Sequence, residues 1–154
     1  MINKLNLVEL VIRPALKETG TWSESAENLL LGTCAQESAM GTYLKQVKGP
    51  ALSIFQIEEA TYNDVWRYLA GKYELGESIL EACNCDQMPE FEQIGWDLRL
   101  ATLVCRVKYW MIPEALPSYN DVDGLAAYWK KYYNTEAGKG TKEEFINNYE
   151  RHVQ

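Results

Sequence analysis

The sequence predicts a compact, mainly helical domain (mainly α) that spans residues 1–154, with at most a small β-hairpin near residues 49–58. Apolar residues recur every three or four positions through most of the chain, which is the pattern of amphipathic helices. Two Thr-x-x-Glu sequences have the spacing of helix capping boxes. No repeat, low-complexity tract or linker divides the chain, and its length suits one domain with its own core.

The first part of the chain predicts two helices and then a turn. Apolar positions at helical spacing predict a helix over residues 5–16, which ends near Gly20. Thr21 and Glu24 predict a capping box at the start of a second, apolar helix that ends within residues 38–41. A Gly-Pro pair and a short apolar run follow, too brief for a helix, so a small β-turn or hairpin is expected there.

Helices also fill the rest of the chain. The longest is predicted over residues 91–111, and Pro113 and Pro117 close it. Either Asp121 or Asp123 caps the next helix, because a short acidic side chain is favoured immediately before the first helical residue, where it can accept a hydrogen bond from a free backbone N–H. Other helices are predicted over residues 58–71, over residues 75–83, and after a capping box formed by Thr141 and Glu144.

The composition excludes several classes of function. The formal net charge is −7, whereas nucleic-acid binding needs clustered Lys and Arg, so no nucleic acid is expected as a partner. The four cysteines fit neither a zinc-ribbon nor a redox spacing, and the only histidine is His152, so no metal or other cofactor is expected. The N-terminus lacks the features of a signal peptide and no apolar run suits membrane insertion, so synthesis in a cytoplasm is expected.

Residue chemistry singles out Glu37 as a catalytic candidate. It lies at the expected C-terminal end of the apolar helix, where apolar neighbours and the negative end of the helix dipole both favour a protonated carboxyl. A carboxyl that keeps its proton near neutral pH can act as the general acid that glycosidic cleavage requires. The structural alternative is a solvated glutamate at a helix end, which is the commoner situation.

The stretch that follows Glu37 resembles the soluble lytic transglycosylases and the goose-type lysozymes. Glu37-Ser38 looks like the Glu-Ser that ends a helix in those families. Residues 53–57, Ser-Ile-Phe-Gln-Ile, look like their Gly-Leu-Met-Gln-Val/Ile segment, and residues 58–61 resemble the start of their next helix. Residues 125–129, Leu-Ala-Ala-Tyr-Trp, resemble the Ala-Ala-Tyr-Asn segment of the transglycosylases.

The resemblance covers roughly residues 29–140 and implies a lysozyme-like α+β fold that is nearly all helical. It implies an active-site cleft between residues 49–58 and the C-terminal helices. The chain departs from the family pattern at two positions. Ser53 stands where the families have Gly, and Trp129 stands where the transglycosylases have Asn.

The resemblance also implies roles for two neighbours of the acid. Ser38 would fix Glu37 or touch an N-acetyl group of the substrate, and Gln56 would line the cleft and bind sugar. The structural alternatives are a helix-end hydroxyl that bonds a backbone carbonyl and a turn amide that bonds the backbone.

One tyrosine would form a hydrogen bond near Glu37, and three candidates remain open. Tyr128 matches the motif directly, whereas Tyr133 precedes an Asn as the family tyrosine does. Tyr132 shares the helical face of Tyr128. The structural alternative for these rings and for Trp129 is packing in the core or on the surface.

Glu58 bears on the type of reaction. A hydrolase that inverts the configuration at the anomeric carbon needs a second carboxylate to activate water. A lytic transglycosylase instead uses the 6-hydroxyl of the sugar and forms a 1,6-anhydro product. Goose-type lysozymes have an Asp after the Gln-Val pair, where this chain has Glu58. The resemblance therefore favours a hydrolase, with a surface glutamate of the next helix as the structural alternative.

Three functions remain after these observations. The first is a phage-encoded muramidase, made in the bacterial host cytoplasm and acting on peptidoglycan glycan strands in the periplasm or cell wall, either as a virion lysozyme or as an endolysin. The second is a structural virion or tail protein with a lysozyme-like fold, whose partners are other virion proteins. The third is a helical interaction module in which Glu37 is only a helix-end charge.

Overall fold

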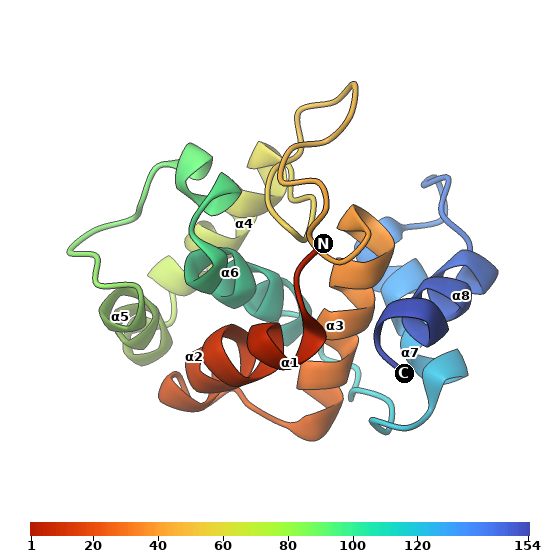
Figure 1. Ribbon diagram of the computed structural model, residues 1–154. Coiled ribbons are helices and arrows are strands. Elements are labelled where there is room, and N and C mark those ends of the chain that lie inside the picture. Colours follow the sequence, from red (N-terminus) through yellow and green to blue (C-terminus); the bar gives the residue numbers. More distant parts are fainter.

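A computed structural model describes residues 1–154 and is mainly helical, as the sequence predicts (Figure 1). Helix α3 runs through the middle of the molecule, with α4, α5 and α6 on one side and α7 and α8 on the other. No helix is long and apolar enough to cross a membrane. The elements are α1 (Lys4–Leu7), η1 (Val8–Ile12), α2 (Arg13–Glu18), α3 (Glu24–Ser38), α4 (Glu59–Ala70), α5 (Tyr73–Ala82), η2 (Phe91–Gly95), α6 (Leu98–Trp110), α7 (Val122–Trp129), η3 (Lys130–Asn134) and α8 (Lys142–His152).

Helix α3 is buried on nearly all sides, because α6, α7 and α8 all pack against it. The capping box predicted for its start is wrong: Ser23 caps the helix, and its hydroxyl accepts a hydrogen bond from the backbone N–H of Ala26 at 3.0 Å. The Thr21 hydroxyl instead lies 3.0 Å from that of Thr19, at the end of α2. Thr21 is therefore used to close the preceding helix rather than to open α3.

The long helix predicted over residues 91–111 is interrupted. A 3₁₀ turn, η2, occupies its first residues, and α6 begins only after Asp97. The carboxylate of Asp97 accepts a hydrogen bond from the backbone N–H of Leu100 at 3.0 Å, which makes Asp97 a helix cap. The longest helix is consequently α3, with 15 residues. The apolar periodicity alone does not reveal the cap within this stretch.

The other helix ends agree with the prediction. Asp121, rather than Asp123, caps α7 and accepts from the backbone N–H of Gly124 at 2.9 Å. Thr141 and Glu144 form the predicted capping box at the start of α8. The first helical stretch ends at Gly20, whose φ of 69° lies in the left-handed region that glycine tolerates best.

The segment between α3 and α4 contains two isolated β-bridges and no strand. Leu52 pairs with Lys45 on one side and with Ile57 on the other. The backbone groups of Leu52 and Ile57 exchange two hydrogen bonds, of 2.8 and 2.9 Å, so residues 52–57 form a tight turn. This turn lies next to the C-terminal end of α3 and to η3, and it forms one wall of the site described below.

Candidate active site

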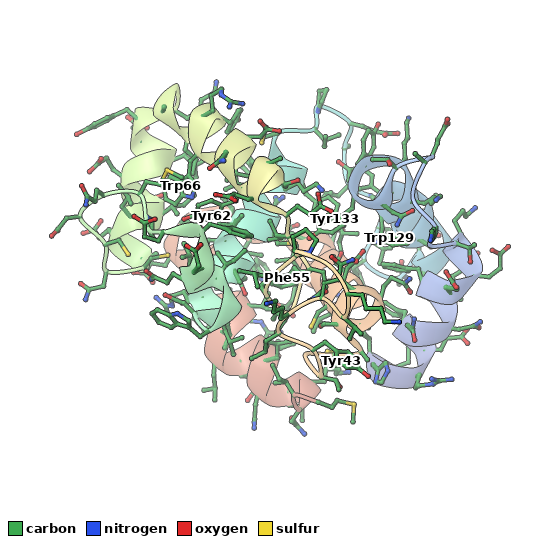
Figure 2. All side chains as sticks on the ribbon, turned by 90° about the horizontal axis from the view of Figure 1, so that it is seen from above. Tyr43, Phe55, Tyr62, Trp66, Trp129 and Tyr133 are labelled. Carbon is green, nitrogen blue, oxygen red and sulfur yellow. The ribbon has the colours of Figure 1, made fainter.

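Glu37 lies on the last turn of α3, half-buried, and faces a cavity of about 290 Å³. The cavity lies where five parts of the fold meet, namely the end of α3, the 52–57 turn, the start of α4, the last turn of α6 and η3. Figure 2 shows two rings of this region, Tyr133 and Trp129, close to Phe55 of the turn near the centre of the molecule. Other residues that line the cavity are Gln56, Glu58, Thr61, Lys108, Asn134 and Thr135.

Burial raises the pKa of the Glu37 carboxyl to about 7. Two neighbours oppose this effect, because the Trp129 indole N–H and the Lys108 ammonium both favour the ionised form. Burial is the largest of the three influences. The buried environment therefore favours a protonated Glu37 carboxyl more than solvent does, in the direction expected from the sequence.

Trp129 holds the carboxyl of Glu37 in place. Its Nε1 donates a hydrogen bond of 2.9 Å to Glu37 Oε1. The indole is fully buried at the end of α7 and packs against the ring of Phe145 in α8, with 5.4 Å between ring centroids. Sequence reasoning treated Trp129 only as a departure from a motif and as a packing residue, although a buried indole N–H generally needs an acceptor.

The 52–57 turn has an unusual backbone at two positions. Ser53 is fully buried with a φ of 78°, a region that favours glycine, and Gln56 has a φ of 49°. The Ser53 hydroxyl accepts a hydrogen bond from the backbone N–H of Phe55 at 3.1 Å. Ser53 thus adopts a conformation typical of Gly. Such backbone strain persists only where the surrounding structure fixes it.

Ser38 does not line the cavity, so the prediction that it touches substrate is wrong. Its hydroxyl is buried and donates a 2.6 Å hydrogen bond to the carbonyl of Ile54, while it accepts one of 2.8 Å from the N–H of Gly41. The reason is geometric, because α3 ends at Ser38 and the chain turns back over its hydroxyl. Ser38 therefore ties the end of α3 to the turn that carries Gln56.

Gln56 lines the cavity, but its amide is partly used by the backbone. Its Nε2 donates to the carbonyl of Ser53 at 2.9 Å and to that of Tyr43 at 3.3 Å. The side chain is thereby fixed across the turn, with its Oε1 left to accept a hydrogen bond from a ligand. Gln56 thus lines the cavity, as predicted, and its amide also bonds the backbone of the turn, which was the structural alternative.

Of the three tyrosine candidates, only Tyr133 reaches the cavity. Its hydroxyl donates to the carbonyl of Phe55 at 2.6 Å, so it secures the turn from the side opposite Ser38. The other two candidates, Tyr128 and Tyr132, do not line the cavity and bond to Glu114 instead. Tyr128 donates to the carbonyl of Glu114 at 2.9 Å, and the hydroxyl of Tyr132 bonds the carboxylate of the same residue. The π-helical turn η3 changes the phase of the helix after α7, so that Tyr133 points inward.

Glu58 and Lys108 provide the charges at the cavity. Glu58 is exposed at the start of α4, and its side chain makes no capping hydrogen bond. Lys108 extends from α6, with its Nζ 3.9 Å from the ring centroid of Tyr133 and 3.4 Å from the carbonyl oxygen of the same residue. Sequence reasoning missed Lys108, although it is the only basic residue in the last turn of a largely apolar helix.

Larger hollows, of about 320, 400, 430 and 450 Å³, lie elsewhere on the molecule. The hollow of about 450 Å³ contains another buried carboxylate, that of Glu27. Arg13 pairs with Glu27 at 2.6 Å, and the Trp22 indole donates to it at 2.8 Å, so this carboxylate already has a cation as its partner. Glu37 has no such ion pair, and it is therefore the better candidate for an acid.

No group of three or more His, Cys, Asp or Glu side chains is arranged to hold a metal ion. Comparison of the chain with protein-family models, with curated proteins and with solved structures finds no match.

Replacement of Glu37 by Gln should stabilise the protein at alkaline pH. The pKa of Glu37 is 4.5 in an unfolded chain and about 7 in the folded protein, so the folded state binds the proton more tightly. The free energy of unfolding of the wild type therefore falls as pH rises from about 4.5 to 7. The variant does not lose this stability, because Gln does not titrate. Above pH 7 we expect Glu37→Gln to be more stable by about 1–3 kcal/mol. Denaturant unfolding at pH 4 and pH 8 checks this, and equal stabilities at pH 8 would contradict it.

Replacement of Trp129 by Phe should raise the pKa of Glu37 further. The indole N–H favours the ionised carboxylate, and Phe keeps an aromatic ring against Phe145 but lacks this donor. An NMR titration of the Glu37 side-chain carboxyl measures the change. Trp22→Phe is the matched control, because it removes an equivalent hydrogen bond to Glu27 instead. A midpoint in Trp129→Phe that equals the wild-type midpoint would show that the hydrogen bond has no influence.

Proposed function

We propose that the protein is a muramidase, which hydrolyses the β-1,4 bond between N-acetylmuramic acid and N-acetylglucosamine in peptidoglycan, with Glu37 as general acid. The observation that carries the proposal is a half-buried carboxyl with a pKa of about 7 that faces a cavity with a second carboxylate, Glu58, in its lining. A general acid is most effective when its pKa lies near the working pH. Glycoside hydrolases use such a pair, in which one carboxyl is protonated and the other is ionised.

The hydrogen bond from Trp129 favours one oxygen of Glu37 as the site of the proton. Nε1 donates to Oε1, and the carbonyl oxygen of a carboxylic acid is a better acceptor than its hydroxyl oxygen, so the acidic proton is favoured on Oε2. From there it would pass to the oxygen of the leaving sugar as the glycosidic bond breaks. The ionised carboxylate left on Glu37 would then be stabilised by the same indole N–H and by Lys108.

Glu58 would act as the base that orients and deprotonates the attacking water. Its carboxylate is exposed, is not used to cap α4 and lines the same cavity as the acid. A water-activating carboxylate needs access to solvent and freedom from other hydrogen bonds, and Glu58 meets both conditions. A lytic transglycosylase would have no use for this residue, which is why we prefer hydrolysis.

Three features around the cavity support the resemblance to the goose-type lysozymes and the lytic transglycosylases. The acid ends a helix, the turn after it has a glycine-like backbone at Ser53, and Tyr133-Asn134 lies against the cavity. Each of these features corresponds to one element of the motifs that resemble those families. The departure at Trp129 gains a reason as well, because the indole supplies the donor for Glu37.

Digestion of purified peptidoglycan tests the proposal. The wild type should release soluble fragments with reducing N-acetylmuramic acid ends, identified by mass spectrometry. Glu37→Gln should reduce the rate by at least about 100-fold, because the general acid is lost. Glu58→Gln should reduce it strongly, whereas Glu59→Gln, an exposed neighbour outside the cavity, should not. The rate should fall as pH rises through about 7, because Glu37 then loses its proton.

Other products would identify other functions. Fragments with 1,6-anhydro ends, lighter by one water, would indicate a lytic transglycosylase and remove Glu58 from the mechanism. No release from several wall types, by a protein that is folded, would contradict the proposal. A structural virion or tail protein with this fold would then explain the chain better.

A further inference from the structure

Lys108 has an unusual environment for a lysine. Its side chain is half-buried. No carboxylate oxygen lies within 4.0 Å of its Nζ, so Lys108 forms no ion pair. Its Nζ lies over the Tyr133 ring and makes one long hydrogen bond, of 3.4 Å, to a backbone carbonyl. An ammonium group withdrawn from water without an ion-pair partner destabilises the folded state.

The cavity gives a reason to keep this charge. Lys108 is the only basic residue that lines it. Burial lowers the pKa of Lys108, while Cys105, Glu37 and Glu58 act in the opposite direction, and neither carboxylate comes close enough to form an ion pair. When Glu37 carries its catalytic proton, its negative charge disappears and the ammonium is left uncompensated on that side of the cavity.

We propose that Lys108 is a specificity-determining residue, which binds a carboxylate of the substrate beside the bond that is cleaved. This inference rests on the proposed function, and it adds that the bound glycan carries a negative charge. Two carboxylates of peptidoglycan have the required chemistry. One is the lactyl carboxylate of an N-acetylmuramic acid that has lost its peptide, and the other is a carboxylate of the peptide stem.

The positive charge of Lys108 favours an anionic ligand over a neutral sugar hydroxyl. A hydrogen bond from a cation to a carboxylate is about twice as strong as one between neutral groups. The chain carries a net charge of −7, which repels anionic polymers at long range. A local cation at the reacting bond would offset this repulsion where the substrate must approach Glu37 and Glu58. Lys108 would thus position the N-acetylmuramic acid ring rather than attract the polymer from a distance.

Three forms of one substrate test the inference. The first is peptide-free glycan strands with free lactyl carboxylates, the second is the same strands with those carboxylates converted to neutral methyl amides, and the third is intact peptide-bearing peptidoglycan. The value of kcat/KM is measured for the wild type, Lys108→Met and Lys108→Arg. Lys131→Met serves as the matched control, because Lys131 is exposed on η3 and pairs with Glu114 outside the cavity.

Because Lys108 also acts on Glu37, Lys108→Met should lower kcat/KM somewhat on every substrate, but we expect the loss to be about tenfold or more greater on a substrate whose carboxylate it binds than on the amidated strands, with the additional change mainly in KM. An additional loss on the peptide-free strands alone identifies the lactyl carboxylate, and an additional loss on the intact polymer alone identifies the stem. Lys108→Arg should retain most of the activity, and Lys131→Met should behave as the wild type.

An equal loss on all three substrates would overturn the inference, because Lys108 would then act only by lowering the pKa of Glu37 or by supporting the fold. No loss on any of them would overturn it as well. Calorimetric binding of the free and amidated strands in the Glu37→Gln background, with and without Lys108→Met, gives the same comparison without turnover. A wild type that binds the free strands through Lys108 but cleaves nothing would contradict the proposed function and leave this inference standing.

Discussion

A carboxyl group at the end of a buried helix needs a hydrogen-bond donor, and in this protein the donor is the indole of Trp129. The 2.9 Å bond from Nε1 to Glu37 joins the end of α3 to the end of α7, two elements separated by most of the chain. It allows the carboxyl to remain near the core without an ion pair. The pKa of about 7 follows from the balance between burial, which raises it, and the Trp129 indole N–H and the Lys108 ammonium, which lower it.

The rest of the site depends on the same arrangement. The 52–57 turn is fixed against α3 by Ser38 and against η3 by Tyr133, which bond the adjacent carbonyls of Ile54 and Phe55. These two hydrogen bonds hold a strained backbone, with Gln56 at its tip facing the cavity. Ser38 and Tyr133, which the sequence offers as substrate-binding candidates, thus position the turn, while the acid itself is positioned by an aromatic residue. Because different residues hold the turn and the acid, the site contains both a strained backbone and a buried carboxyl. Each of these lowers the stability of the folded chain.

The helical fold could be predicted from the sequence because it depends on local signals. Apolar spacing and the Thr141–Glu144 capping box predict the helices, and the apolar helix before Glu37 predicts the burial of its carboxyl. The errors arise where a side chain has two possible uses. The Thr21 hydroxyl closes α2 instead of capping α3, and Asp97 caps a helix within an unbroken apolar pattern. Such choices depend on the neighbours in space rather than in sequence.

The composition of the site was harder to predict, because it depends on contacts between distant segments. The motif indicates that a tyrosine is needed but not that the π-helical turn brings Tyr133 inward in place of Tyr128. Nothing in the linear pattern relates Lys108 or Trp129 to Glu37, which lie more than 70 positions away in the chain. Both residues are recognisable only from unusual chemistry, a buried indole N–H that needs an acceptor and a lysine without an ion pair.

The ionisation of Glu37 in the folded wild type is the most direct test of this account. Carbon-13 NMR of the side-chain carboxyl, assigned with Glu37→Gln, measures its midpoint, and the Trp129 indole N–H resonance should follow the same titration. The account predicts a midpoint near 7 for both signals. A midpoint near 4.5, the ordinary value for glutamate, would mean that the carboxyl is ionised at neutral pH and cannot serve as the acid of the site.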